Sequence, residues 1–203
     1  RDSWYSVLRG RLSKADRVMA SKTEICNRAL AAIGQDEILT LDDSSKAARC
    51  CRIFYDPVRR RLQRKHSWVF ALCTTTAPKI GAATNQDFLF QYQKPNDCLR
   101  LVRVADGRAT YNLEGSYIYS DDDPLVIRYV QDIQDPNLFD DSFTECLVIL
   151  LATALIAPLG CDIAREQYYD KKFEAALAEA RHINAIEQNT PELFEGNWVP
   201  ARG

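Results

Sequence analysis

The sequence predicts an α+β protein, a mainly helical four-helix bundle into which a small antiparallel β subdomain is inserted. Three observations lead to this fold class. Apolar residues recur with helical spacing in the first third and the last third of the 203-residue chain. Between them lie short segments rich in β-branched and aromatic residues, separated by turn signals. Because helices flank the strands in sequence, the two helical halves are expected to close into one bundle.

These patterns divide the chain into five segments. They are an N-terminal extension (1–20), a first helical half-bundle (21–67), a β subdomain (68–131), a second helical half-bundle (132–189) and a C-terminal docking tail (190–203). Met19 is the only methionine and looks like a natural start. Residues 1–18 are therefore either a genuine extension or an artefact of the gene model.

Two helices are expected in the first half. Ser21 and Glu24 form a capping-box pattern at the start of the first helix, and Gly34 is a natural stop. The second helix is expected over 45–66, with a kink at Pro57 because proline lacks an amide hydrogen. Its apolar stripe has helical spacing and consists of Cys51, Phe54, Tyr55, Val58 and Leu62.

The middle of the chain is expected to form short strands. One strand is predicted over Cys98–Val104, where two arginines interrupt an apolar run and indicate partial exposure. Asp106-Gly107 follows it and is typical of a tight hairpin turn between two strands. Another strand is predicted over Leu125–Val130.

Helix is expected again in the last third. Asp135-Pro136 marks a helix start, and Ser142–Glu145 forms a second capping box before a strongly apolar helix that ends near Gly160. The apolar run, 146–159, is shorter than the ~20 residues that a membrane span needs. We therefore interpret it as a buried helix and expect no membrane. An alanine-rich last helix is predicted over 163–188.

Charge is distributed unevenly along the chain. The formal net charge is −2 at pH 7, so the whole molecule is not a general polyanion binder. Residues 44–66 contain eight basic residues and one acid, which gives +7. Residues 1–18 carry +3, and −12 is left for the remainder.

The sequence contains no recognisable catalytic, nucleotide-binding or metal-binding motif. The seven cysteines include no C-x-x-C pair, and we interpret them as reduced, buried hydrophobic residues. His66 and His182 each follow a basic residue and are expected to be solvated. Asp121–Asp123 is expected to be a solvated turn rather than a cation site. These observations predict a protein that is not an enzyme and needs no cofactor.

The basic helix is the strongest remaining functional signal. Its arginines cluster opposite or beside the apolar stripe, and an isoleucine shares their face, which favours contact with a protein surface. We predict a subunit interface at Arg49, Arg52, Ile53, Arg60 and Arg64. Two alternatives stay open. The face could be merely solvated, or residues 49–65 could bind nucleic acid with an affinity that falls steeply with salt.

The last segment has a different composition. Breakers of regular structure alternate there with large apolar side chains, which favours docking on another surface over a free tail. The predicted docking residues are Leu193, Phe194, Trp198 and Val199.

The order of these motifs resembles a known family, the tail tubular protein A family of head-to-tail adaptors in short-tailed bacteriophages. In that family a helix ending in an I-G step, here Ile33-Gly34, precedes a helix with an alanine-arginine motif, here Ala47–Arg49. A W-x-F strand follows, here Trp68–Phe70. The segment FQYQKPNDCLRLVRV (90–104) resembles a strand pair of the family, and the resemblance covers residues 22–190.

The resemblance implies a structural virion protein rather than an enzyme. It implies a homo-oligomeric ring, typically a dodecamer, that is assembled in the host bacterial cytoplasm and lies in the neck of the virion. The expected partners are the portal protein, a tail nozzle resembling tail tubular protein B, and tail fibres. Genomic DNA would pass through the lumen without sequence-specific contacts. The tail (190–203) would reach towards the portal.

Overall fold

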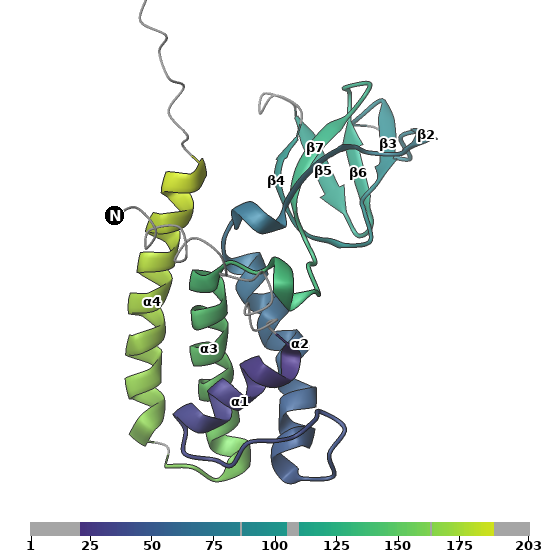
Figure 1. Ribbon diagram of the computed structural model, residues 1–203. Coiled ribbons are helices and arrows are strands. Elements are labelled where there is room, and N and C mark those ends of the chain that lie inside the picture. The colour runs from purple at the N-terminus through teal and green to yellow at the C-terminus, as the bar shows by residue number, and fades with distance from the viewer. Residues whose placement is uncertain (1–20, 86, 105–109, 163, 189–203) are drawn as a thin grey trace, which may run out of the picture.

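The computed structural model describes residues 21–85, 87–104, 110–162 and 164–188, and it shows a helical domain joined to a β domain (Figure 1). The helices are α1 (Lys22–Ala32), α2 (Lys46–Lys65), α3 (Asp141–Leu159) and α4 (Ala164–Gln188). All the strands come between α2 and α3 in sequence. The prediction of an α+β fold with a β insertion between two helical segments is therefore confirmed.

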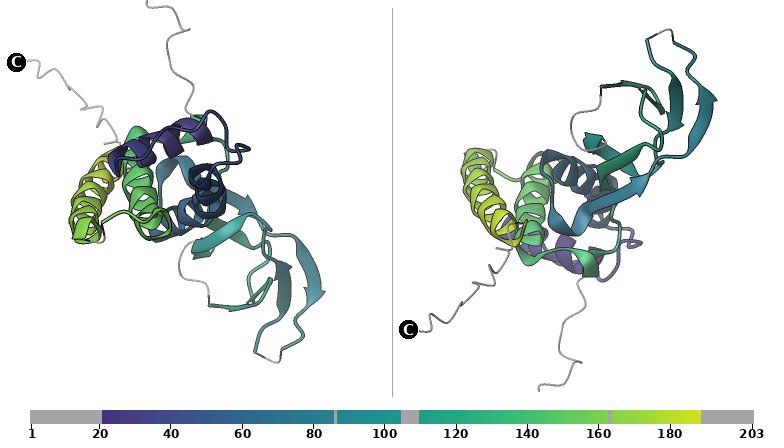
Figure 2. Two further views of the ribbon diagram at one scale, coloured as in Figure 1. Left: turned by 90° about the horizontal axis from the view of Figure 1, so that it is seen from below. Right: turned by 90° about the horizontal axis from the view of Figure 1, so that it is seen from above.

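The arrangement of the helices differs from the expected four-helix bundle, which is not supported. Helix α3 lies in the centre and packs against α1, α2 and α4, whereas α1 and α2 meet over a short stretch only (Figure 2). The physical reason is the composition of α3, which is apolar on every side and so must be covered on every side. Four helices with one apolar face each would instead share a core between them.

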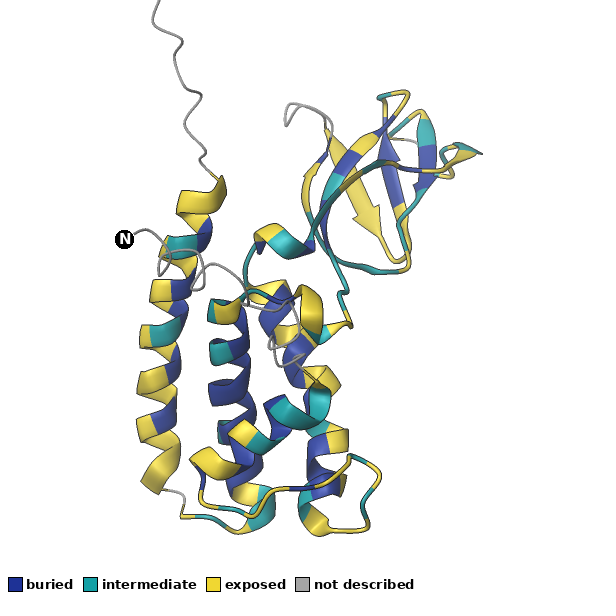
Figure 3. Cartoon of the chain, viewed as in Figure 1, coloured by how far each residue is buried: buried dark blue, intermediate teal, exposed yellow. Residues whose placement is uncertain are grey.

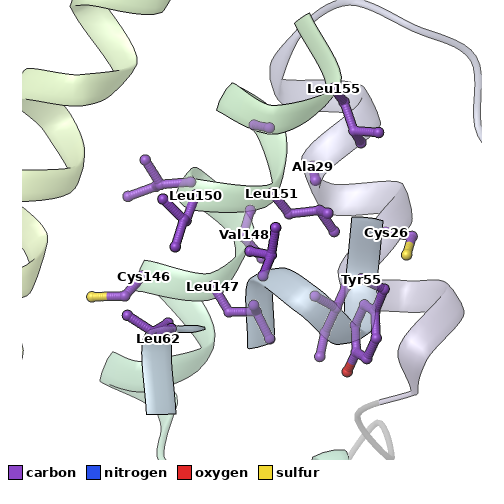
Figure 4. Packing of buried hydrophobic residues seen from close by; sticks show 14 of the residues in the cluster. Cys26, Ala29, Tyr55, Leu62, Cys146, Leu147, Val148, Leu150, Leu151 and Leu155 are labelled. Atoms are coloured by element: carbon purple, nitrogen blue, oxygen red, sulfur yellow. The ribbon is translucent and has the colours of Figure 1, made fainter. Parts of the chain in front are cut away.

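The core of the helical domain surrounds α3, which is buried along most of its length (Figure 3). Leu147, Leu151 and Leu155 of α3 pack against α1 and α2, whose buried residues include Cys26 and Tyr55 (Figure 4). By length and hydropathy alone α3 would qualify as a membrane span. Its burial beneath three other helices explains that hydropathy as the signature of a core helix.

The helix ends follow the expected chemistry with one correction. The Ser21 hydroxyl accepts a hydrogen bond from the Glu24 amide at 3.0 Å. Gly34 and Gly160 end α1 and α3 with φ angles of 76° and 74°, a left-handed conformation that favours glycine. Helix α3, however, is capped by Asp140, whose carboxylate accepts from the Ser142 amide at 2.8 Å. The predicted capping box at Ser142 therefore lies inside the first turn of the helix.

The β domain consists of two antiparallel sheets that share one small core. The first sheet has the order β1-β7-β4 and the second β2-β3-β6-β5. Buried residues from both sheets, among them Tyr92, Ile118 and Ile127, pack together between them. The strands are β1 (Leu72–Thr76), β2 (Lys79–Ala82), β3 (Phe90–Gln93), β4 (Cys98–Val104), β5 (Tyr111–Glu114), β6 (Tyr117–Ser120) and β7 (Val126–Gln131).

Two local predictions about the β domain are wrong. Trp68–Phe70 is not a strand: Val69–Ala71 forms a 3-10 turn, η1, and β1 begins only at Leu72. The Asp106-Gly107 turn, which lies outside the described residues, does not connect paired strands. β4 pairs with β7 and β5 pairs with β6, so the hairpin is closed at Gly115 instead. Turn chemistry alone could not distinguish a hairpin from a crossover between two sheets.

The two domains are joined on one side by Ser67–Ala71 and on the other by Asp132–Asp140, which contains the 3-10 turn η2 (Pro136–Leu138). Aromatic side chains fill the space between these connections. Trp68, Phe70, Phe139 and Phe143 lie with ring centroids 5.0–6.3 Å apart. Since such pairs add to the energy of burial, the junction is expected to be stiff.

Candidate functional site: an arginine-lined groove beside α2

The five predicted interface residues all lie exposed on α2, but they form two groups. Arg49, Arg52 and Ile53 lie in its first half, where Ile53 is 64% exposed. Arg60 and Arg64 lie in its second half. With a rise of 1.5 Å per residue, the two groups are separated by roughly 10 Å or more along the helix axis. Of the five residues, Arg60 and Arg64 together line a hollow of the surface.

The second group lines a groove between α2 and the β domain, which we call the arginine groove. It consists of two adjoining hollows of about 430 and 330 Å³ that share Arg60, Arg64 and Leu99. The first is completed by Asp56, Pro57 and Arg61. The second is completed by Lys94, Pro95, Asn96, Cys98 and Ser116.

The lining of the arginine groove combines apolar residues, which we call its floor, with basic residues, which we call its rim. Pro57 and Leu99 provide apolar surface. The Arg60 Nε lies 3.4 Å from Asp132 Oδ2. In the part of the chain that the structure describes, neither Arg61 nor Arg64 has a carboxylate within 4.0 Å. These cations are therefore free to meet acidic groups of a partner, and guanidinium groups suit carboxylates particularly well.

Arg59 has a different role that the sequence reasoning missed. It is only 1% exposed, so it belongs to the buried side of α2 rather than to its basic face. Its Nη1 donates to Asp132 Oδ1 at 2.5 Å and to the Ile133 carbonyl at 2.6 Å, and its Nε donates to Asp56 Oδ1 at 3.2 Å. Gln63 donates to the same Ile133 carbonyl at 2.8 Å. Arg59 and Gln63 together tie α2 to the segment that leaves the β domain.

One sequence signal could have revealed this role. Arg59 follows Tyr55 by four residues and precedes Leu62 by three, so it stands at the edge of the buried stripe. Gln63, four residues further on, extends the same polar row. A charged residue and an amide spaced by one helical turn beside a core stripe are typical of a buried polar network.

A second set of bonds holds the arginine groove in shape. Arg100 of β4 donates from Nε to the Arg64 carbonyl at 3.1 Å and from Nη2 to the Ser67 hydroxyl at 2.8 Å. The Asp132 amide donates to the Asp97 carbonyl at 2.8 Å. The two bonds of Arg100 connect the end of α2 to β4, and the Asp132 bond connects the segment after β7 to the loop before β4. The arginine groove is thus built by both domains, which these bonds join.

The prediction that both histidines are solvated holds for His182, which is exposed, but is wrong for His66. The His66 ring is half-buried, and its Nε2 lies 3.0 Å from the Asn184 amide nitrogen. Asn184 is buried and also bonds the Ser67 carbonyl and the Val69 amide. Burial and the nearby charges of Arg181 and Arg100 lower the pKa of His66 below its usual 6.5. His66 and Asn184 together help to fix α4 to the junction.

The other candidates for chemistry have structural roles. No group of three or more potential metal ligands occurs among the residues that the structure describes. Asp121 accepts from the Leu89 amide at 2.8 Å, and Asp123 pairs with Lys79 at 2.7 Å, so both stabilise the turn between β6 and β7. The seven cysteines are free thiols; Cys26, Cys50, Cys51 and Cys146 are buried as expected, whereas Cys73, Cys98 and Cys161 are partly exposed. The predicted docking residues Leu193, Phe194, Trp198 and Val199 lie outside the described residues.

Comparison of the chain with models of known protein families and with curated proteins finds no match. Its function is therefore inferred from its residues and their geometry.

Proposed function

We propose that this chain is a head-to-tail adaptor of a short-tailed bacteriophage. In the proposed role, copies of the chain form a ring, expected to be dodecameric, between the portal and the tail nozzle, and DNA leaves through the lumen. The proposal comes from the order of motifs over 22–190 that resembles the tail tubular protein A family. It makes the chain a structural part of the virion neck, assembled in the host cytoplasm, rather than an enzyme.

The arginine groove is the observation that supports a role in assembly. Arg61 and Arg64 stand beside an apolar floor without carboxylate partners among the described residues. An isolated protein gains little from such an arrangement, because unpaired cations over apolar surface contribute nothing to its own folding. Arginine beside apolar side chains is instead enriched in protein interfaces. This supports a protein partner over a solvated surface.

The domain arrangement also suits an adaptor. We assign ring formation to the helical domain, and contact with the nozzle or fibres to the β domain. The tail, 190–203, is assigned to the portal. Removal of 191–203 is expected to weaken attachment to the portal without preventing folding, and unchanged attachment would rule out this assignment.

The test is particle mass and shape, measured by light scattering and negative-stain imaging with and without the portal protein encoded in the same genome. Rings formed alone or only on the portal would support the adaptor proposal. A monomer that ignores the portal would contradict it.

The second candidate function is nucleic-acid binding by residues 49–65. It is favoured by the same free cations, since phosphates could take the place of carboxylates. A monomer that binds DNA at low salt and loses it steeply at higher salt would favour this candidate.

A further inference from the structure

Leu39 is the most exposed large apolar residue among those the structure describes. Its side chain is 90% exposed. It belongs to the segment between α1 and α2, residues 34–45, which we call the acidic loop. Exposure of a single leucine is ordinary in a mobile segment. Here, however, the surrounding backbone is fixed by several hydrogen bonds.

The bonds on both sides of Leu39 hold it in place. Asn27 of α1 makes two bonds with Ile38: its amide nitrogen donates to the Ile38 carbonyl at 2.9 Å, and its oxygen accepts from the Ile38 amide at 2.9 Å. Ile38 is itself buried in the core. On the other side, Asp43 accepts from the Leu39 and Thr40 amides at 3.0 and 3.2 Å. Leu39 is therefore presented to solvent by an ordered scaffold.

The chemistry around Leu39 is the opposite of that around the arginine groove. The acidic loop contains Asp36, Glu37, Asp42 and Asp43 and no basic residue. The lining of the arginine groove contains Arg60, Arg61, Arg64 and Lys94 but only one carboxylate, Asp56, and Asp132 pairs with Arg60 from outside the lining. Arg28 and Arg52 lie beside the acidic loop, and Arg52 pairs with Asp42 at 3.7 Å, which leaves Asp36 and Glu37 as the carboxylates that can meet the basic residues of a groove.

We infer that the acidic loop of one copy of this chain docks in the arginine groove of the next copy, with Leu39 on the floor formed by Pro57 and Leu99. This inference rests on the proposed function only for closure of the contact into a ring. The occupant is a second copy because charge and shape are complementary between two surfaces of the same chain. A nucleic acid would supply phosphates but no apolar group for the floor.

The acidic loop and the arginine groove of one copy lie too far apart to contact each other. The acidic loop immediately precedes α2, whereas Arg60 and Arg64 follow the start of α2 by four to five turns, roughly 21–27 Å at 1.5 Å per residue. The contact must therefore join different copies by different surfaces. Repeated contacts of this kind produce either a closed ring or an open filament.

Charge reversal tests the pairing directly. The groove variant is Arg61→Glu/Arg64→Glu, chosen because neither residue has a carboxylate partner in the described part of the chain. The loop variant is Asp36→Lys/Glu37→Lys, at two exposed positions. Each variant alone is expected to remain monomeric in sedimentation velocity at concentrations where the unmodified chain assembles. Like charges would face each other at every contact.

A mixture of the two variants supplies the decisive result. In an alternating assembly each reversed groove meets a reversed loop, and each original groove meets an original loop, so every contact is again complementary. Equimolar mixing is therefore expected to restore assembly, with the two variants in equal numbers by native mass spectrometry. The matched control is Arg103→Glu/Lys171→Glu, an equal change of charge at exposed sites elsewhere, which is expected to assemble normally.

Leu39→Ser tests the apolar part of the contact. Because Leu39 is 90% exposed, folding is expected to be unaffected. Association is expected to weaken roughly ten- to hundredfold, the effect of losing one buried leucine side chain from an interface. Leu89→Ser, at a leucine that is 62% exposed on the β domain, is the matched control and is expected to change nothing.

The outcomes separate this inference from the proposed function. Failure of the mixture to assemble, or normal assembly of either variant alone, would overturn the loop-groove contact and leave the adaptor proposal standing if rings still form. Mixing-dependent filaments without rings, even with the portal, would support the contact and contradict the adaptor. If the groove variant loses DNA binding but assembles normally, the arginine groove binds the phosphates of nucleic acid, and the inference is overturned.

Discussion

Arg59→Met is expected to be among the most destabilising single substitutions on α2. The substitution keeps an apolar stem of similar length but removes the guanidinium that bonds Asp56, Asp132, Gln63 and the Ile133 carbonyl. Asp132 then keeps a carboxylate that is only 14% exposed and lacks its closest cation. Breaking a buried pair in this way costs about 3–5 kcal/mol. We expect the lower end, about 3 kcal/mol, because Arg60 remains 3.4 Å from Asp132.

The assay is urea unfolding at pH 7 followed by the fluorescence of Trp68, which is 1% exposed at the junction of the domains. Trp4 and Trp198 are replaced by Phe in every variant, so that Trp68 is the only tryptophan. Arg60→Met is the matched control. Its side chain is 58% exposed, and an exposed ion pair contributes at most about 1 kcal/mol.

Two results would refute the reasoning about Arg59. One is a loss below about 1 kcal/mol, similar to that of the control, which would mean that water replaces the lost bonds. The other concerns the double variant Arg59→Met/Asp132→Leu. Since removal of both charges leaves no unpaired carboxylate, it is expected to be more stable than Arg59→Met alone. A further loss of stability would show that the ion pair itself is not the cause.

Three further predictions concern other parts of the fold. Folding favours the neutral form of His66, because the pKa of His66 in the folded protein lies below 6.5. The stability that this contributes above pH 6.5 is therefore expected to be lost as the pH falls through the folded pKa. Urea midpoints between pH 8 and 5 test this, and an equal dependence of the midpoint on pH in His66→Gln would contradict it. Gly160→Ala is expected to cost about 1 kcal/mol in the same assay, because only the left-handed backbone is strained and no atom beyond the neighbouring residues lies within 4 Å of the added methyl group. Ala157→Gly, at an exposed residue inside α3, is the control for an ordinary exchange of glycine and alanine. An unchanged stability in Gly160→Ala would contradict the role of Gly160 as the left-handed end of α3. Leu151→Ala should cost about 2–5 kcal/mol because Leu151 is fully buried in α3; a cost below 1 kcal/mol would mean that α3 is not the centre of the core.

Local features of the fold could be predicted from the sequence because local chemistry decides them. Ser21, Gly34 and Gly160 act at helix ends through groups within a few residues. Strand pairing could not be predicted in this way, because it depends on which sheet receives each strand. β4 pairs with β7, more than twenty residues away, and the turn signal after β4 contains no information about that partner. The same limit explains why a four-helix bundle was predicted but is not supported. The packing of helices depends on how their apolar faces are shared, and this cannot be seen in each helix separately.

The candidate site, too, could be predicted only in its local features. Exposure of Arg60 and Arg64 followed from the helical period, but the hollow beside them did not, since its other wall comes from β4 and from the loop before it. The role of Arg59 was missed and His66 was wrongly predicted to be solvated, because their partners, Asp132 and Asn184, lie 73 and 118 residues away in sequence. A helical wheel gives the direction of a side chain but not the surface that it meets.

The sharing of Asp132 between neighbouring arginines connects assembly with the domain junction. Asp132 bonds the buried Arg59 through one oxygen and lies beside the exposed Arg60 through the other. A carboxylate that docks in the arginine groove would compete for Arg60, which would leave Asp132 more strongly paired with Arg59. Because Arg59 ties α2 to the exit from the β domain, docking is then expected to stiffen the junction rather than loosen it. Slower amide exchange at Asp132 and Ile133 in assembled than in monomeric protein would support this coupling, and unchanged exchange would show that the groove and the junction act independently.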